Sequence, residues 1–494
     1  MSDAEPITTI ALFGRPHELW PAAAILGQSL PGYIGLTIVE DTAGAARPAA
    51  LSLAQSDDFF SALDIDIREL LSACDGIFGL GTELQGLPSE GASFFTAPSA
   101  ELPRIAGVRL HDIMLRAAHL HSDPDQLGYL MQPFRFAANA ALAGKFASPD
   151  MPALSPARML GPTLQIDRGK YADFLKKSFL PKSANLISAL PVSVQENAHD
   201  SALETVNLDN GDSVSADLFV DVSGALSGLA SGDPQKQPGI LPFDRIVACF
   251  DGASDEAGHH NRRLRAMPGG IAIETPLRNA AISELLFSSA DMDEAALDGM
   301  AGEGAVTETF DAYYSAKPWT GNLLRLGSAS ACLGPYHSAD MRLLHAHVKL
   351  LAAHIPADKN MAIEAEEFNH HQMRSLEEIR DFAWLPFLAN RREDGLWKDM
   401  ADAPPPESLQ LRIDQFESRG NFVGYDYEIF DSQSWTELMI GLGIIPRRFD
   451  PMARRLDMRR AQSELKNLAN ELSQAIARMP EHAEFMAEYF AENT

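Results

Sequence analysis

The sequence predicts an α/β fold with added α+β elements, built from two closely packed modules over residues 1–330 and 331–494. Within residues 10–40 a strand, a helix and a second strand follow one another, which is the order of a parallel-sheet crossover. After residue 340 the chain is instead mostly helical in pattern. We therefore expect a strand-rich, discontinuous first module and a mainly helical second module.

The first crossover unit ends in a carboxylate. Ile10–Phe13 predicts a buried strand, Gly14 opens a turn, Leu19–Ser29 has the alanines of a helix, and residues 35–40 predict a strand that ends at Glu40. This order is typical of a Rossmann-like dinucleotide-binding unit, in which the terminal acid binds a ribose. An exposed acid at a strand end is the alternative interpretation of Glu40.

The remaining elements are predicted from turn signals and helical spacing. Residues 204–221 alternate as a hairpin around Asn210-Gly211, and its second arm continues into a turn of small residues. Loops with short strands are predicted over residues 76–100. Helices are predicted over residues 56–72, over 341–354, over 361–394 with a break near Pro386, and over 452–492 with a break at Pro480.

The composition limits the classes of partner. Lysine plus arginine number 40 and aspartate plus glutamate 68, a net charge of −28, so we expect neither a nucleic-acid nor a membrane partner. The start of the chain lacks the pattern of a signal peptide and no run is apolar enough to span a membrane, so a cytoplasmic location is expected. The three cysteines lie far apart and neighbouring histidines diverge, so neither disulfides nor a metal site is predicted.

Five segments along the chain, in order, match one set of motifs. They are Asp167-Arg168 with Phe174 and Leu175, Ala216–Gly224, Pro318-Trp319 with Asn322 and Gly327, Ile379–Phe382 with Asn390–Asp394, and Ser434-Trp435 with Gly441, Gly443 and Pro446. Together they resemble the flavin-dependent tryptophan halogenases, which are relatives of the FAD monooxygenases. The resemblance implies an FAD-binding module, with Gly14, Glu40, Asp221, Gly224 and Gly327 as candidate cofactor-binding residues, and a helical substrate-side module.

The resemblance also implies a chemistry. In that family reduced flavin reacts with oxygen, the flavin peroxide meets a halide, and hypohalous acid crosses a tunnel to an indole. A lysine and a glutamate near the substrate direct the oxidised halogen.

The phosphate loop that the resemblance requires is incomplete in residues 14–19, where only Gly14 of three glycines remains. Pro16 has no N–H to offer a phosphate, and Leu19 is bulky where the helix must pack closely on the strand. Glu18 is expected to place a negative charge toward the pyrophosphate. The sequence therefore predicts weak FAD binding or none.

The positions of the family's catalytic groups are changed as well. Gly79 stands in the place of the lysine and His337 in that of the glutamate, so no catalytic residue is predicted. Ile271 and Ile273 replace two tryptophans, which is expected to widen the substrate cleft. Asp340 replaces a glycine near the halide site, where a like charge makes chloride binding costlier.

A retained scaffold with altered chemical groups predicts a pseudoenzyme that acts by binding. We expect a homodimer or a complex with an active halogenase-like paralogue through the C-terminal helices, or a peptide or aromatic ligand in the former substrate cleft. Trp319, Tyr336, Trp384 and Trp397 are either anchors for such a partner or ordinary core residues. The alternative function is an active FAD-dependent halogenase or monooxygenase that acts on an indole or a tryptophan-containing substrate.

Overall fold

The protein is represented by a computed structural model. The residues that it describes are 5–43, 47–97, 104–120, 126–149, 155–199, 201–230, 236–239, 241–252, 260–292, 304–309, 311–334, 336–425 and 427–491.

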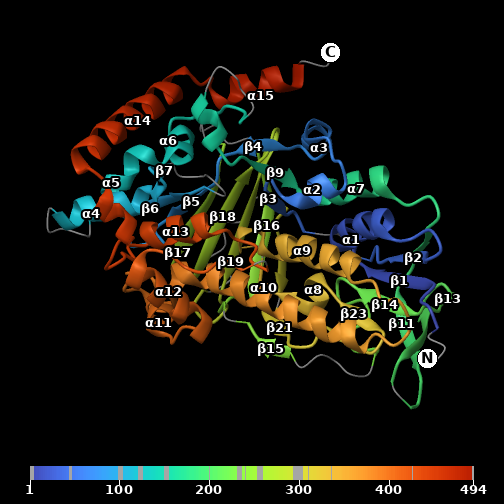
Figure 1. Cartoon of the computed structure of the whole chain (residues 1–494). Helices are drawn as coiled ribbons and strands as arrows, with labels where there is room; N and C mark the ends of the chain where they lie inside the picture. The colour runs from blue at the N-terminus through green and yellow to red at the C-terminus, as the bar shows by residue number, and fades with distance from the viewer. Residues whose placement is uncertain are drawn as a thin grey trace.

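A six-stranded, mainly parallel sheet is one of the two large sheets of the fold (Figure 1). Its strands are, in order, β10 (Asn185–Ser188), β2 (Gly35–Glu40), β1 (Thr9–Gly14), β14 (Leu218–Asp221), β23 (Leu323–Arg325) and β22 (Trp319–Thr320). The first five are parallel and β22 pairs antiparallel to β23. The parallel order confirms the predicted α/β class and the crossover unit.

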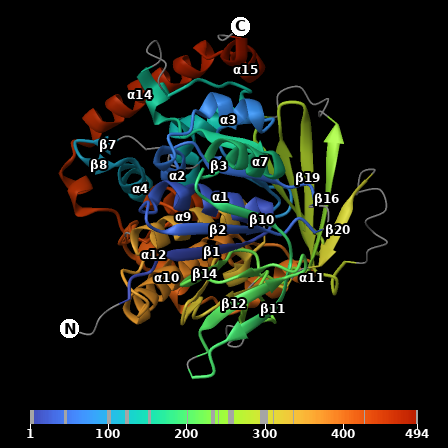
Figure 2. The same ribbon diagram turned by 90° about the vertical axis from the view of Figure 1, so that its right-hand side faces the viewer.

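Helices cover one face of this sheet. The helix α1 (Pro16–Ser29) connects β1 to β2 and packs against α7 (Arg168–Phe179) and α9 (Ala339–Ala353) (Figure 2). Leu19–Leu26 within α1 are buried. The register pairs Gly14 with Glu40, so the carboxyl ends of β1 and β2 lie side by side.

A second, seven-stranded sheet stands beside the first (Figure 2). Its strands are, in order, β20 (Val306–Thr309), β16 (Arg245–Gly252), β19 (Ala280–Phe287), β18 (Gly270–Pro276), β17 (Arg262–Met267), β5 (Thr82–Gln85) and β6 (Ser93–Thr96). Smaller sheets are β3 (Ala50–Ala54) with β9 (Thr163–Asp167) and β4 (Ile77–Gly79), β11 (Pro191–Glu196) with β12 (Leu203–Leu208) and β13 (Ser213–Val214), β15 (Lys236–Pro238) with β21 (Tyr313–Ser315) and β24 (Ala331–Cys332), and β7 (Arg104–Ile105) with β8 (Val108–Arg109).

The other helices gather around the two sheets. They are α2 (Asp58–Ala62), α3 (Ile67–Ala73), α4 (Leu110–Leu120), α5 (Leu127–Met131), α6 (Phe136–Leu142), α8 (Gly327–Ser330), α10 (Ala362–Leu388), α11 (Gly395–Asp402), α12 (Glu407–Arg419), α13 (Ser432–Gly441), α14 (Met458–Arg478) and α15 (His482–Ala491). None of the helices that the structure describes has the length and apolar character that crossing a membrane requires.

Several predicted elements differ from the structure. The helix expected over residues 56–72 is divided into α2 and α3, because Asp64 adopts a positive φ and Asp66 caps the second helix. The helix predicted over residues 361–394 is interrupted near Pro386, as expected: α10 ends at Leu388, with the proline itself inside its last turn, and α11 begins only at Gly395. The break at Pro480 is confirmed.

The hairpin prediction is confirmed only in its first arm and turn. β12 pairs with the two-residue β13 around Gly211, which has a positive φ. The residues that follow then leave the hairpin and form β14 in the parallel sheet.

Residues on both sides of position 330 contribute to one hydrophobic core. It includes Leu12 of β1, Leu26 of α1, Leu344 of α9 and Leu472 of α14. The helix α14 lies along α6, far from α6 in the sequence (Figure 1). The two predicted modules are thus in contact through a shared core, and their boundary stays a prediction.

Candidate functional site

The five candidate cofactor residues meet at the carboxyl edge of the parallel sheet. Gly14, Glu40 and Asp221 end β1, β2 and β14, Gly224 follows β14 in a turn, and Gly327 begins α8. In open α/β sheets this edge is where ligands bind. The structure therefore brings together the residues that the sequence singled out, and their role in cofactor binding stays a prediction.

Asp221 organises the turn after β14. One carboxylate oxygen accepts N–H groups from Ser223, Gly224 and Ala225 at 2.8 to 3.2 Å, and the other accepts the Leu226 N–H at 2.9 Å. Burial raises the pKa of Asp221, and the four N–H groups oppose that rise. Asp221 thus has a structural partner at each oxygen.

At two positions of this edge, Gly14 and Gly327, a larger side chain would collide with a neighbouring group. A Cβ atom on Gly14 would lie closer than 3.0 Å to the side chain of Val222, so the end of β1 approaches the neighbouring turn as only glycine permits. Gly327 has a φ of +50°, and a Cβ atom there would lie 2.9 Å from Glu18 Oε1.

Glu40 is buried and fully engaged. Its carboxylate accepts a hydrogen bond from Trp20 Nε1 at 2.8 Å and one from Lys176 Nζ at 2.7 Å. Only 3% of Glu40 is exposed, so the interpretation as an exposed strand-end acid is wrong. Its two oxygens already have partners within the chain where a ribose hydroxyl would bind.

Glu18 points inward, unlike the orientation expected from the sequence. One of its carboxylate oxygens accepts the Ser328 N–H at 2.8 Å and the other accepts the Ser328 hydroxyl at 2.6 Å. Burial raises the pKa of Glu18 to about 7, although Arg168 and Ser328 favour the ionised form. The Glu18 carboxylate is therefore hydrogen-bonded to the first turn of α8 and does not face the solvent. Leu19 beside it is fully buried in the core, so this helix accommodates the bulky side chain.

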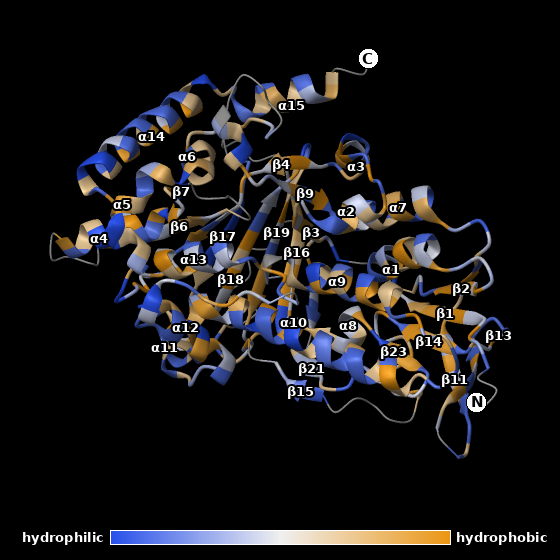
Figure 3. Cartoon of the chain, in the orientation of Figure 1, coloured by the Kyte–Doolittle hydropathy of each residue, from blue (hydrophilic) through white to orange (hydrophobic). Residues whose placement is uncertain are grey.

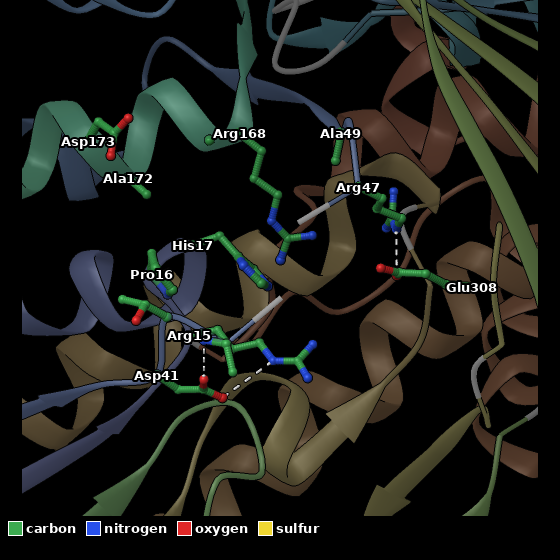
Figure 4. A pocket seen from close by; sticks show the side chains of 13 residues that line it. Arg15, Pro16, His17, Asp41, Arg47, Ala49, Arg168, Ala172, Asp173 and Glu308 are labelled. Carbon is green, nitrogen blue, oxygen red and sulfur yellow. Dashed lines mark hydrogen bonds and ion pairs between the residues drawn. The ribbon is translucent and has the colours of Figure 1, made fainter. Parts of the chain in front are cut away.

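A cavity of about 380 Å³ opens at the same edge (Figure 4). It lies over the first turn of α1, the residues that follow β2 and the start of α7. Its lining is Arg15, Pro16, His17, Asp41, Thr42, Ala43, Arg47, Ala49, Arg168, Gly169, Ala172, Asp173 and Glu308.

These residues do not fit FAD in the pose that the phosphate loop would require. Pro16 lies in the first turn of α1 and offers no N–H to a pyrophosphate. Glu18 fills the space between α1 and α8 with a carboxylate, and Glu40 is closed by Trp20 and Lys176.

Position 79 has no room for a side chain. Gly79 ends β4, and a Cβ atom there would lie closer than 3.0 Å to Gln165 Nε2 and to Thr163 Oγ1, both on the adjacent strand β9. Gln165 is fixed in place because its Nε2 donates to the His260 carbonyl at 2.6 Å. A lysine at this position would displace these neighbours.

The 3-10 turn that contains His337 is held by hydrogen bonds to the next residue, Ser338. The His337 backbone belongs to the 3-10 turn Tyr336–Ser338, and its side chain lies outside the described part of the chain. The Ser338 hydroxyl accepts the Ser52 N–H at 2.9 Å and an Arg262 N–H at 3.3 Å.

Ile271 and Ile273 of β18 are buried in the hydrophobic core. The cavity lined by Gly81, Phe382 and Phe430 holds about 40 Å³, and a cavity of about 490 Å³ shares Arg342 with it. The widening of the substrate cleft stays a prediction.

The four large aromatic side chains considered as anchors lie inside the protein. Trp319, Tyr336, Trp384 and Trp397 are each at most 8% exposed. They are core residues, and the anchor interpretation is wrong.

The sequence interpretation missed the basic residues of the cavity. Arg15 and His17 directly follow β1, a position that indicates a ligand-binding loop, whereas Arg168 belongs to a family motif and Arg47 lies in a loop with no such signal. Asp340, expected to repel a halide, pairs with Arg168 at 3.0 Å, so its charge is balanced.

The comparisons with known proteins agree with this fold. Residues 10–458 match a family model described as tryptophan halogenase. The chain belongs to the tryptophan halogenase family. It is 22% identical over 484 residues to the tryptophan 7-halogenase RebH of Lentzea aerocolonigenes, covering 89% of this chain and 90% of that protein. It is 23% identical to the tryptophan 6-halogenase SttH of Streptomyces toxytricini, covering 97% of each chain.

Solved structures of flavin-dependent halogenases share the whole fold. BrvH from Brevundimonas sp. BAL3 superposes with a TM-score of 0.87 at 25% identity, covering 98% of this chain and 99% of that chain. A flavin-dependent halogenase from Xanthomonas campestris superposes with a TM-score of 0.88 at 23% identity, with the same coverage. These neighbours confirm the Rossmann-like FAD-binding fold.

Proposed function

We propose that this member of the family does not halogenate, binds FAD weakly or not at all, and acts as a binding protein or partner subunit. The observation that carries the proposal is the Glu18 carboxylate, which is inserted between α1 and α8 and held by two hydrogen bonds to Ser328. This carboxylate lies in the first turn of α1, where a dinucleotide-binding loop places the pyrophosphate of its cofactor.

A second observation supports the absence of halogenation. Position 79 is glycine and its surroundings, Gln165 and Thr163, exclude any longer side chain. A group that directs an oxidised halogen has to project from its strand toward the substrate. The described residues around position 79 leave no path for one.

The test is a flavin titration combined with a turnover assay. Purified protein is titrated with FAD, and in parallel it is supplied with a flavin reductase, halide, oxygen and either free tryptophan or indole. RebH serves as the positive control. We expect no stoichiometric FAD binding and no halogenated product.

A matched variant sharpens the flavin measurement. Pro16→Gly with Glu18→Ala and Leu19→Gly returns the loop to three glycines, and we expect it to bind FAD at least about tenfold more tightly than the natural chain. Tight FAD binding by the natural chain together with halogenated product would contradict the proposal. The alternative, an active halogenase or monooxygenase on an indole or a tryptophan-containing substrate, would then hold.

A binding protein needs a ligand or a partner. We propose that this chain binds a protein, either a second copy of itself or an active relative. The apolar side chains of α14, among them Leu465 and Leu472, already lie in the core of the same chain. Hydrophilic residues cover much of the rest of this helix (Figure 3). This surface supports a polar contact rather than an apolar helix-in-groove contact.

A further inference from the structure

The last two helices carry opposite charges at their two ends. Residues 447–466, which include the start of α14, hold seven lysines and arginines and three aspartates and glutamates. Residues 467–491, which include α15, hold one arginine and four glutamates. A basic segment in a chain of net charge −28 is thus followed directly by an acidic one. Both helices lie at or beyond residue 458, where the match to the family model ends.

The basic end of this helix pair is open to a partner. Arg455, Arg459 and Lys466 are exposed, and they form no ion pair with the residues that the structure describes. Arg460, on the flank of the same helix, is by contrast paired with Glu464 at 2.8 Å. Three cations at the start of α14 therefore remain available for carboxylates from outside the chain.

The acidic end is a row of glutamates at α15. Glu481, Glu484 and Glu488 are exposed, and their spacings of three and four residues place them on one face of the helix. Glu481 pairs with Lys145 at 2.5 Å, whereas Glu484 and Glu488 have no ion-pair partner within the described part of the chain. This end therefore offers carboxylates to cations from outside the chain.

Between the two ends, the outward face of α14 is polar. The helix packs on the protein through its buried residues, Ala461, Leu465, Leu472 and Ala475. At 3.6 residues per turn, the opposite face carries exposed residues without large apolar side chains, namely Arg459, Ser463, Lys466, Asn470, Gln474 and Ala477. Such a face can form hydrogen bonds with a second polar helix.

We propose that two copies of this chain associate through α14 and α15, packed antiparallel about a two-fold axis near Asn470, with the basic end of each copy on the acidic end of the other. The proposal rests on the proposed partner role and commits it to a second copy. Arg459 lies 11 residues before Asn470 and Glu481 lies 11 residues after it, so such an axis brings the two opposite each other. Arg455 comes opposite Glu484 in the same way.

A second copy matches this surface better than other partners do. An acidic protein would match the basic end alone, and a nucleic acid or an anionic membrane would be repelled by the glutamates of α15 and by the net charge of the chain. A second copy supplies both signs of charge, and the two-fold axis repeats each ion pair. The two helices lie at the outer edge of the molecule in both views, where a second copy can approach (Figures 1 and 2).

The contact is expected to be weak and sensitive to salt. At 1.5 Å per residue α14 is about 31 Å long, so one helix pair buries less than the roughly 800 Å² per partner of a stable interface. Exposed ion pairs each add little. We therefore expect a dissociation constant in the micromolar range at about 0.1 M salt, and weaker association at about 1 M, where the screening length falls to about 3 Å.

Sedimentation velocity of the full chain over a range of concentrations, with charge-reversal variants, tests the proposal. The basic-end variant is Arg455→Glu with Arg459→Glu, and the acidic-end variant is Glu484→Lys with Glu488→Lys. Each variant alone brings like charges together twice and is expected to associate at least about tenfold more weakly than the natural chain. Mixed in equal amounts, the two variants are expected to recover a dimer, because each then meets opposite charge at both ends.

Matched controls carry the same changes of charge away from α14 and α15. They are Glu366→Lys with Glu367→Lys, at exposed positions of α10, and Lys177→Glu with Lys182→Glu, at exposed positions in and after α7. Both controls are expected to associate as the natural chain does. Recovery of the dimer in the mixture also shows that both end variants are folded.

Each measurement has a result that overturns the proposal. A natural chain that stays monomeric at about 100 μM and 0.1 M salt contradicts it, as does a mixture of the two end variants that stays monomeric. A dimer that neither end variant weakens uses another surface and also contradicts it. A monomeric natural chain leaves the proposed function standing through a complex with an active relative, whereas FAD binding and turnover by a dimeric chain contradict the proposed function and leave the dimer.

Discussion

Replacing Glu18 by glutamine isolates the free energy that its buried carboxylate costs the fold. The glutamine side chain keeps the shape of the glutamate, since its amide oxygen can accept the Ser328 N–H and its amide nitrogen can donate to the Ser328 hydroxyl. The substitution therefore resembles the protonated form of Glu18. We expect the variant, Glu18→Gln, to be more stable than the natural chain above neutral pH.

The magnitude follows from the pKa. In the folded protein the pKa of Glu18 is raised from 4.5 to about 7, so between these values the folded state binds more protons than the unfolded state. The free energy of unfolding consequently falls as pH rises through this window. The difference corresponds to about 3 kcal/mol at pH 8 and vanishes below pH 4.5.

Thermal unfolding at pH 5 and at pH 8 measures this effect. With an unfolding entropy of about 2 cal/mol/K per residue over 494 residues, 3 kcal/mol shifts Tm by about 3 °C. Glu18→Gln should therefore gain about 3 °C over the natural chain at pH 8 and much less at pH 5. Glu367→Gln, at an exposed position of α10, is the control and should show no such difference. Equal Tm values for Glu18→Gln and the natural chain at both pH values would refute the reasoning.

Three further outcomes are expected. Gly79→Ala should lower the free energy of unfolding by about 1 to 3 kcal/mol because its Cβ meets Gln165, whereas Gly32→Ala, in open space, should not; equal denaturation curves would contradict this. Trp20→Phe should cost about 1 to 3 kcal/mol by leaving one Glu40 oxygen unpaired, and this cost should shrink in the Glu40→Gln background; an unchanged cost would show that the hydrogen bond does not matter. Size-exclusion chromatography with light scattering should give a particle heavier than one 53.7 kDa chain, alone or with an active relative; a strict monomer in both cases would exclude the partner role.

Local patterns predicted the elements well where neighbours in the sequence decide the structure. The strand Gly35–Glu40 has the predicted bounds, because its apolar residues and the flanking turns are all local. The orientation of Glu18 could not be predicted in this way. Its partner, Ser328, lies 310 residues away, so no local signal distinguishes an inward carboxylate from an outward one.

The same limit applies to the site. The sequence identified Gly14 and Glu40 as candidates, yet the partner that closes Glu40 from α7, Lys176, lies 136 residues further along the chain. The cavity arginines come from three separate segments, and only folding brings them together. Residue type at a motif position thus predicted where the site lies, while the contacts that fill it required the structure.

The altered positions are filled by the chain's own side chains, which explains why single reversions should fail. Glu18 is bonded to α8, Leu19 is packed in the core, and Gln165 takes the space beside Gly79. Removing one of these groups leaves a cavity or an unpaired polar atom, each costing stability, without returning the other two features. Restoring both a flavin site and a directing side chain therefore requires concerted changes, in α1 for the first and in the β4–β9 pair for the second.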